Sequence, residues 1–220
     1  MSDLLRGVLW DLDGTLIDSG ELHWVTWRDA LANEGFELSR EAFNERFGQR
    51  NDRFLRTLLD PDLSQEKIDR ISGAKESAYR AMVRSDGITI LPGALHWLET
   101  LQAQGWRQAI ASSAPRQNIE VIMEVVGFDQ YAAVYVGSED VQHGKPDPEV
   151  FLVAAERIGV PPDRCIVVED SPAGIQAGRD GGMRTIAVLT THDQMEGDIV
   201  TASLDALAPD IFERLLTGTP

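Results

Sequence analysis

The chain has 220 residues, of which 43% are hydrophobic and 25% are charged, as in an ordinary globular protein. Its 36 acidic residues outnumber its 20 basic ones and give a formal net charge of -16, which would repel nucleic acids and anionic membranes. Cys165 is the only cysteine, so no intrachain disulfide can form, and we expect it to be a buried apolar residue rather than a nucleophile. Without a signal peptide or a membrane-length apolar run, we expect a cytoplasmic protein.

The first predicted element is a short apolar strand, Val8–Trp10, with the continuous apolar character of a strand buried on both faces. The block that follows contains no convincing strand. Its helical patterns lie at 20–34, 39–47, 51–59 and 64–84, separated by turn residues. An all-helical block after the first strand of an α/β core is predicted to be an inserted cap domain. We place this cap at residues 19–86 and the core at residues 1–18 and 87–220.

From about Gly93 onward, predicted strands and helices alternate. The strands are Gln108–Ala111, Ala133–Val136, Ile166–Val168 and Thr185–Leu189. The helical patterns lie at 93–104, 115–126, 147–158 and 171–181. This alternation predicts an α/β fold with a doubly wound parallel sheet, to which the first strand also belongs.

Two aspartates follow the first strand, in the run Asp11-Leu12-Asp13-Gly14-Thr15. The period of a strand places Asp11 and Asp13 on the same side of the chain. Because two like charges so close together repel, such a pair is usually held by a cation or shares a proton. A solvated turn, in which aspartate acts as a local cap beside Gly14, is the alternative.

Other polar groups follow the ends of two further strands. In open α/β sheets, ligands bind outside the carboxyl ends of the strands. Ser112 and Ser113 follow one predicted strand, Glu169 and Asp170 follow another, and Lys145 lies between them in a rigid turn. Each signal has an ordinary explanation when taken alone: a helix-capping serine, a solvated lysine, or acidic residues at a helix N-terminus.

Taken together, these groups favour phosphoryl transfer. Carboxylate oxygens suit a hard cation such as Mg²⁺. A lysine and a serine at a helix N-terminus suit a phosphate group. A carboxylate can then accept the phosphoryl group and form an aspartyl phosphate.

The chain resembles the haloacid dehalogenase superfamily over essentially its full length. The run from Asp11 to Thr15 is similar to the first motif of that superfamily. The second, third and fourth motifs are matched by Ser112, by Gly144-Lys145-Pro146 and by Glu169-Asp170. The run from Glu169 to Ile175 resembles the β-phosphoglucomutase-like group and related sugar-phosphate phosphatases, and the helical block resembles the mobile cap of one branch.

The resemblance implies a role for each matching residue. Asp11 would be the nucleophile and a magnesium ligand, and Asp13 the general acid and base, with its backbone carbonyl facing the metal. The phosphate-binding residues would be Leu12, Ser112, Ser113 and Lys145, and the further metal ligands Glu169 and Asp170. Members that cleave carbon–halogen bonds lack an aspartate at position 13, so its presence favours phosphoryl transfer.

Within the cap, the resemblance points to His23, Arg50, Asn51 and Lys75 as residues near the substrate. A histidine soon after the first motif couples cap closure to the general acid in β-phosphoglucomutases, and His23 matches its place. Lys75 and Tyr79 reproduce a Lys-x-x-x-Tyr pattern of the same enzymes. Packing inside the cap is the alternative for His23, and solvation on a helix surface is the alternative for Lys75.

The cap also departs from the mutases. Their phosphate-gripping arginine aligns with Asn51, and Arg50 is adjacent, which argues against mutase activity. Trp24 and Trp27 lie three residues apart, and we expect them to pack inside the cap.

The resemblance predicts a magnesium-dependent phosphatase that hydrolyses a small phosphorylated metabolite, a sugar or polyol phosphate, through an aspartyl phosphate. The alternative is a β-phosphoglucomutase-like isomerase that moves a phosphoryl group between sugar hydroxyls. A non-catalytic phosphorylation switch would need no helical insert, and Asp13 would promote loss of its phosphate. We expect a small-molecule partner but no nucleic acid or membrane, and a monomer, because this branch needs no second chain to complete its site.

Overall fold

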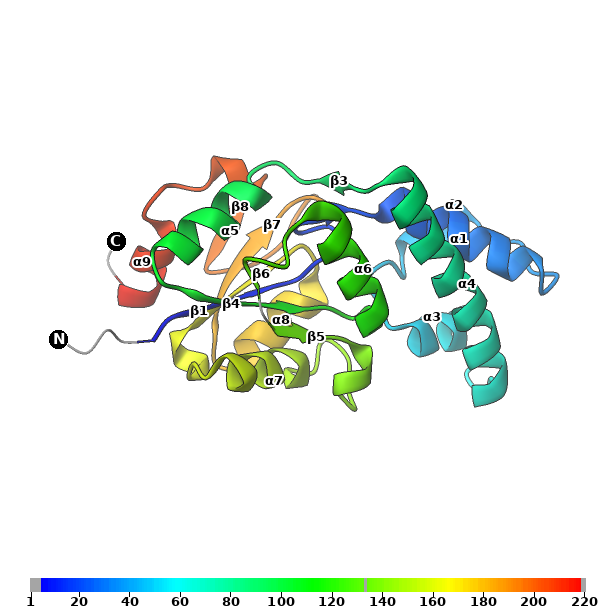
Figure 1. The fold of residues 1–220 in the computed structure, drawn as a ribbon. Helices are drawn as coiled ribbons and strands as arrows, with labels where there is room; N and C mark the ends of the chain where they lie inside the picture. Colours follow the sequence, from blue (N-terminus) through cyan, green and yellow to red (C-terminus); the bar gives the residue numbers. More distant parts are fainter. Residues whose placement is uncertain (1–4, 133, 219–220) are drawn as a thin grey trace.

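The computed structural model describes residues 5–132 and 134–218, and these form two lobes side by side (Figure 1). One lobe holds a parallel sheet between layers of helices. The other consists of helices α1 to α4, which we call the cap. The described chain begins just before β1 and ends just after α9, at the end of the core lobe that is away from the cap.

Within the described residues, the core sheet has six strands and every neighbouring pair is parallel. In spatial order the strands are β5 (Val134–Val136), β4 (Arg107–Ala111), β1 (Gly7–Trp10), β6 (Cys165–Glu169), β7 (Arg184–Val188) and β8 (Ile199–Thr201). The central strand is β1, in which Leu9 pairs with Ala109 on one side and with Val167 on the other. The expected α/β fold with a doubly wound parallel sheet is therefore confirmed.

Helices cover both faces of this sheet. They are α5 (Ala94–Ala103), α6 (Arg116–Val126), α7 (Glu149–Ile158), α8 (Pro172–Asp180) and α9 (Ile211–Thr217). Val8 and Trp10 pack with residues of α5, α6 and α9, whereas Leu9 packs with residues of α7 and α8. Because successive side chains of β1 enter opposite cores, the strand needs apolar residues at every position.

The cap has an apolar core of its own. Its helices are α1 (Gly20–Ala32), α2 (Arg40–Asn44), α3 (Asn51–Leu58) and α4 (Gln65–Asp86). Trp27 lies in this core, stacked on Phe54 with ring centroids 4.4 Å apart, and Trp24 packs against it, as expected from the sequence. The C-terminal half of α4 contributes Tyr79 and Val83 to the main core instead, so one helix joins both lobes.

Several elements lie outside the sequence prediction. The short strands β2 (Ile17–Asp18) and β3 (Thr89–Ile90) form an antiparallel pair where the chain passes between the lobes. Strand β8 and helix α9 were also not expected. Three short 3₁₀ turns complete the description, at Ser138–Asp140, Pro162–Arg164 and Leu204–Ala206.

Most of the predicted boundaries shift by one or two residues. The largest difference is α2, which ends at Asn44 rather than at residue 47, and α4 continues two residues further, to Asp86. The predicted strand residue Ala133 and the chain ends at 1–4 and 219–220 lie outside the described residues. Cys165 is buried, as predicted. None of the helices in the described ranges is long and apolar enough to cross a membrane.

Gly93 before α5 provides a test of this packing. Its φ is 84°, and a Cβ there would lie 2.3 Å from the backbone nitrogen of Asp205. Gly105 has a similar φ of 78° but no atom within 4 Å of that position. We expect G105A to lower the free energy of unfolding by about 1 kcal/mol, the cost of a left-handed backbone. We expect G93A to lower it by about 3 kcal/mol, because its Cβ would also overlap the backbone of Asp205. Urea denaturation of both variants measures the difference, and equal losses would contradict this packing.

Candidate active site

The carboxyl ends of β1, β4 and β6 meet at one edge of the sheet, where they face the cap (Figure 1). Asp11 follows β1, Ser112 follows β4, and Glu169 ends β6. After Asp11 the chain turns sharply, because the carbonyl of Leu12 accepts the N–H groups of Leu16 and Ile17. This turn brings Asp13 back toward the same edge.

Gly14 is required in this turn. Its φ is 86°, and a Cβ would lie 2.1 Å from Oδ2 of Asp170. A side chain at position 14 would therefore displace Asp170 from the edge of the sheet as well as strain the backbone.

Lys145 is held between two carboxylates. Its Nζ donates to Oδ1 of Asp11 at 2.5 Å, to Oε1 of Glu169 at 2.7 Å, and to the carbonyl of Ala111 at 3.2 Å. Burial alone would lower the pKa of Lys145, but Asp11 and Glu169 raise it above its usual value. Lys145 therefore stays positively charged in the site.

Asp11, Glu169 and Asp170 form a buried acidic cluster whose ligand atoms lie within 4.8 Å of one another. Burial, together with the charges of Glu169 and Asp170, raises the pKa of Asp11 well above its usual value, although Lys145 opposes the shift. One ammonium cannot balance three carboxylates. Oxygen donors at this spacing fit a hard divalent cation such as Mg²⁺, which prefers carboxylates and keeps several waters.

Two threonines orient Asp170. Thr191 Oγ1 donates to Asp170 Oδ2 at 2.5 Å, and Thr15 Oγ1 donates to Oδ1 at 3.3 Å. The ring of His192 lies 3.1 Å from the Asp170 carbonyl oxygen. The loop after β7 thus fixes one wall of the acidic cluster.

Asp13 is bound to the first helix of the cap. Ser19 Oγ donates to Oδ1 of Asp13 at 2.6 Å, and Nε2 of His23 lies 3.1 Å from the same oxygen. Burial would raise the pKa of Asp13, but the bonds from His23 and Ser19 hold it below its usual value. Asp13 is therefore ionised in this arrangement.

The other ring nitrogen of His23 faces Lys75, with 2.8 Å between Nδ1 and Nζ. A lysine ammonium has no acceptor, so Nδ1 accepts and Nε2 carries the proton that faces Asp13. Lys75 Nζ also donates to Glu76 Oε1 at 2.9 Å. Lys75 is 1% exposed, which excludes the solvated lysine considered from the sequence.

Glu76 ties this chain of contacts to the core. Asn51 Nδ2 donates to its Oε1 at 2.8 Å, and Asn118 Nδ2 on α6 donates to its Oε2 at 2.5 Å. Arg80 Nη1 in turn donates to Asn118 Oδ1 at 2.9 Å. A continuous polar network thus runs from Asp13 through the cap to helix α6.

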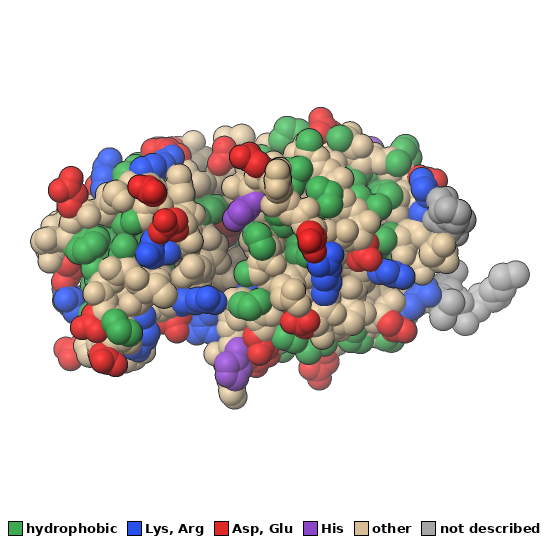
Figure 2. All heavy atoms as spheres, turned by 180° about the vertical axis from the view of Figure 1, so that it is seen from behind, with side chains coloured by type: hydrophobic (Ala, Val, Ile, Leu, Met, Phe, Trp, Pro, Cys, Tyr) green, Lys and Arg blue, Asp and Glu red, His purple; other side chains and the backbone are tan. Residues whose placement is uncertain are grey.

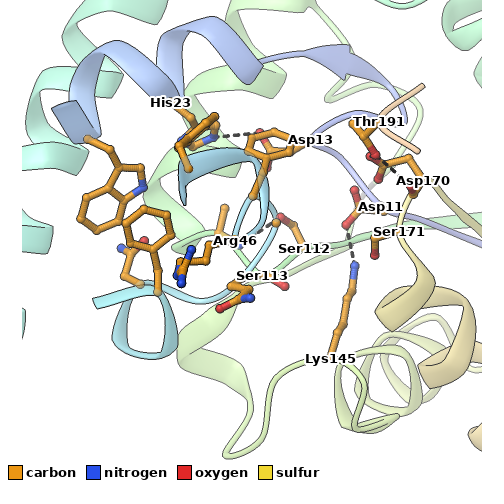
Figure 3. A pocket seen from close by; sticks show the side chains of 18 of the residues that line it. Asp11, Asp13, His23, Arg46, Ser112, Ser113, Lys145, Asp170, Ser171 and Thr191 are labelled. Atoms are coloured by element: carbon orange, nitrogen blue, oxygen red, sulfur yellow. Dashed lines mark hydrogen bonds and ion pairs between the residues drawn. The ribbon is translucent and has the colours of Figure 1, made fainter. Parts of the chain in front are cut away.

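A pocket between the two lobes collects these groups. The space-filling view shows the molecule hollowed between the lobes (Figure 2), and the close-up shows core and cap side chains facing one another across the pocket (Figure 3). The aromatic part of its lining comes from the cap: Trp27, Phe43, Phe47 and Phe54. Ser112 and Ser113 line the core side, where Ser112 Oγ accepts the N–H of Ala114 at 3.0 Å.

Most of the residues singled out in the sequence line this one pocket. They are Asp11, Asp13, His23, Asn51, Lys75, Ser112, Ser113, Lys145, Glu169 and Asp170. Asp11 is 6% exposed, so the solvated-turn alternative is wrong. Leu12 is fully buried beneath its turn.

Arg50 does not line the pocket. Its Nη1 lies 3.3 Å and 3.4 Å from the carbonyl oxygens of Val141 and Gln142, to which it donates. Arg53 similarly donates to the carbonyl of Lys145 at 3.4 Å. Both arginines connect the cap to the loop that carries Lys145.

Several polar residues of the site were not identified from the sequence, among them Ser19, Arg46, Gln49, Glu76, Thr191 and His192. Thr191 and His192 follow the end of β7, so the rule that singled out the other strand ends would have found them. Ser19 immediately precedes α1, where a serine is expected as a helix cap. Arg46 and Glu76 carried no signal beyond being charged residues of the helical block.

Comparisons with known proteins show the family to which this chain belongs. Residues 5–182 match the haloacid dehalogenase-like hydrolase family. Hexitol phosphatase A of Escherichia coli is 32% identical over 215 residues, which cover 92% of this chain and 93% of that protein. Fructose-1-phosphate phosphatase YqaB of the same organism is 29% identical over 192 residues, covering 86% and 98%.

The fold has a counterpart among solved structures. A β-phosphoglucomutase from Clostridium difficile superposes with a TM-score of 0.88 and covers 98% of both chains, at 22% identity. Fold and site together define an α/β hydrolase with a helical cap. The chain belongs to the haloacid dehalogenase-like hydrolase family. It is accordingly an enzyme of the phosphoric monoester hydrolase class.

The acidic cluster predicts how stability depends on pH and metal. Burial and the neighbouring Glu169 raise the pKa of Asp170 to about 8, whereas an unfolded aspartate titrates at about 3.9. Between these values the unfolded chain binds fewer protons than the folded one, so the metal-free protein loses stability as pH rises from about 4 to about 8. We expect Mg²⁺ to raise the melting temperature more at pH 8 than at pH 5.

The variant D170N tests the origin of that effect. Without metal at pH 8, it should exceed the wild type in stability by at least about 1 kcal/mol, the equivalent of one pKa unit. It should also lose most of the response to Mg²⁺. D86N, at the exposed end of α4, is the control and should behave as the wild type in thermal unfolding with EDTA or Mg²⁺. A wild type that is indifferent to both pH and Mg²⁺ would exclude a metal site here.

Proposed function

We propose that this protein is a magnesium-dependent phosphatase that hydrolyses a small phosphorylated metabolite, a sugar or polyol phosphate, through an aspartyl phosphate on Asp11. The observation that carries the proposal is the position of Lys145, bonded to both Asp11 and Glu169 at the edge of the acidic cluster. A lysine so placed neutralises the nucleophilic carboxylate and the incoming phosphate at once.

The first step would form one bond and break one. Asp13 is ionised in the substrate-free site and would take up a proton when the anionic phosphate binds beside it. A carboxylate oxygen of Asp11 then attacks phosphorus, and the ester oxygen of the substrate leaves with that proton from Asp13. Lys145, Ser112 and the N–H of Ser113 hold the phosphoryl oxygens. In the second step Asp13 takes a proton from water as the water attacks phosphorus, which releases phosphate and restores Asp11.

Asp11, Glu169 and Asp170 would hold Mg²⁺, together with the backbone carbonyl of Asp13. The ion would supply positive charge that stabilises the transferring phosphoryl group. In its absence the buried carboxylates repel one another, as the raised pKa values of Asp11 and Asp170 indicate.

The surroundings of Asp13 support its role in proton transfer. The contacts from Ser19 and His23 both go to Oδ1. No hydrogen bond from the described residues goes to Oδ2 of Asp13, and Oδ2 is therefore the oxygen available to the leaving group. His23 and Lys75 would set the direction of this carboxylate, and residues 19–86 would form the cap that closes over the substrate and excludes water.

Two observations favour a phosphatase over a mutase. Two relatives that match most of the chain are phosphatases by name, one of hexitol phosphates and the other of fructose 1-phosphate. In addition, Arg50 is directed to backbone carbonyls of the core, and the amide of Asn51 is bonded to Glu76. Neither is therefore free to grip a second phosphate in the way proposed for mutases.

Replacement of the nucleophile tests the proposal directly. We expect D11N to lower kcat by more than about 10⁴-fold, because an amide cannot attack phosphorus, while circular dichroism shows an intact fold. Release of inorganic phosphate from hexitol and fructose phosphates with Mg²⁺ measures the loss. Substantial residual turnover would exclude Asp11 as the nucleophile, and isomerised sugar phosphate without phosphate release would establish the mutase instead.

Replacement of the general acid should depend on the leaving group. We expect D13N to lower kcat by about 10²–10⁴-fold on hexitol phosphates, because an alkoxide leaves only when it is protonated. The loss should be much smaller in the burst of p-nitrophenol released from p-nitrophenyl phosphate, whose phenolate needs no proton. Rapid-quench kinetics on both substrates measures the two losses. Equal losses in the bond-breaking step would contradict the role of Asp13 as acid.

A further inference from the structure

Most of the polar side chains that the cap places in the pocket already have partners. His23 uses both ring nitrogens, one toward Asp13 and one toward Lys75. Lys75 is shared with Glu76, which also accepts from Asn51. These groups are arranged to hold one another and Asp13, so they contribute little to recognition of a substrate.

Arg46 and Gln49 differ from this set. Arg46 uses only Nη1, which donates to the carbonyl of Ala42 at 2.7 Å and to Glu45 Oε2 at 2.9 Å. Its Nε is buried without a hydrogen-bond partner, and so is Oε1 of Gln49. Both residues line the pocket. Because a buried polar atom without a partner is costly, a pair of them in one pocket indicates a ligand that supplies the missing bonds.

The setting of Arg46 favours a negatively charged partner. The rest of the cap wall is aromatic, with Phe43, Phe47 and Phe54 lining the same pocket, and a cation beside such a wall is poorly solvated. Its only carboxylate partner within the described residues, Glu45, is 61% exposed. A pair so open to water compensates little of the charge.

The position of Arg46 assigns it to the leaving group rather than to the phosphoryl group. In Figure 3 it lies on the far side of Ser112 and Ser113 from Lys145 and Asp170. Lys145, Ser112 and the acidic cluster already surround the point at which the phosphoryl group would lie. A substrate that occupies that point extends its remaining atoms toward the cap.

We propose that Arg46 and Gln49 form the subsite for the leaving group, and that the preferred substrates carry an anionic oxygen group there, a carboxylate or a second phosphate, beside a hydroxyl. The guanidinium binds the anionic oxygens through Nε and Nη2, and Gln49 accepts the hydroxyl. This assignment rests on the proposed phosphatase function and changes its substrate class to phosphorylated sugars, polyols or the acids derived from them that carry a second anionic group.

Matched pairs of substrates test the assignment. 3-Phosphoglycerate and glycerol 3-phosphate differ in a carboxylate against a hydroxymethyl group, and fructose 1,6-bisphosphate and fructose 1-phosphate differ in a second phosphate. We expect the wild type to have the higher kcat/KM for the anionic member of at least one pair, and the pair that shows the preference identifies which anion is bound. R46Q should reduce that preference by about 10- to 100-fold, mainly through KM.

Two further variants separate charge from packing. R46K keeps the charge but loses the fork of donors, so it should retain part of the preference. R28Q is the matched control, because Arg28 lies on α1 of the cap, pairs with Asp29 and is 48% exposed in its side chain; it should keep the wild-type ratio. Wild-type preference for the neutral members, or an unaltered ratio in R46Q, would overturn the proposal. Equal losses by R46Q on every substrate, p-nitrophenyl phosphate included, would also overturn it and would place Arg46 on the phosphoryl group.

Binding distinguishes failure of this proposal from failure of the proposed function. Calorimetry of D11N with the same four compounds requires no turnover. Tighter binding of an anionic member by D11N, lost in the D11N/R46Q double variant, supports the subsite. If the wild type nevertheless hydrolyses none of the compounds, that absence of hydrolysis counts against the phosphatase function and not against the subsite. Equal binding of the two members within each pair would overturn the subsite. It would not affect the proposed phosphatase activity, which the phosphate-release assay tests separately.

Discussion

The repulsion among Asp11, Glu169 and Asp170 is the constraint on which the rest of this structure depends. Three buried carboxylates within 4.8 Å of one another oppose folding unless cations compensate them. Lys145 supplies one charge, and its bonds to Asp11 and Glu169 leave Asp170 to be held by threonine hydroxyls. The negative charge that remains uncompensated would favour a divalent cation, so the cost in stability falls at the proposed metal site.

The sheet provides the rigidity that such a cluster requires. Asp11 and Glu169 leave neighbouring strands, β1 and β6, whose parallel register fixes their separation through the backbone. The central position of β1, paired on both sides and buried on both faces, allows little relaxation of the acids away from one another. Gly14 then lets the following turn pass within contact of Asp170. A site on mobile loops would separate its like charges, whereas this one is held together by strand pairing.

The parts of the site that follow from the residue pattern itself are those governed by strand geometry, whereas His23, Asn51 and Lys75 were predicted only through the family resemblance. Asp11, Ser112, Glu169 and Asp170 were found because strands have a period of two and parallel strands end at a common edge. The cap residues obey no such rule. Arg46 faces the pocket and Arg50 faces backbone carbonyls of the core, but this depends on the irregular chain between α2 and α3, where no periodicity applies. In the sequence, Glu76 cannot be distinguished from the surface charges of α4. It is buried only because α6 packs against α4 and brings Asn118 into contact with it.

The polar network from Asp13 to Asn118 explains why one helix belongs to both lobes. The N-terminal part of α4 packs into the cap, and its C-terminal part packs into the main core, with Lys75 and Glu76 between the two. Each member of the network is buried and would be costly without its partner, so Asn118 on the core, Glu76 and Lys75 on α4 and His23 on α1 stabilise one mutual arrangement. In that arrangement the proton of His23 faces Asp13. The contact between cap and core and the orientation of the proposed general acid are thus maintained by the same hydrogen bonds, and a displacement of the cap that broke them would also release Asp13.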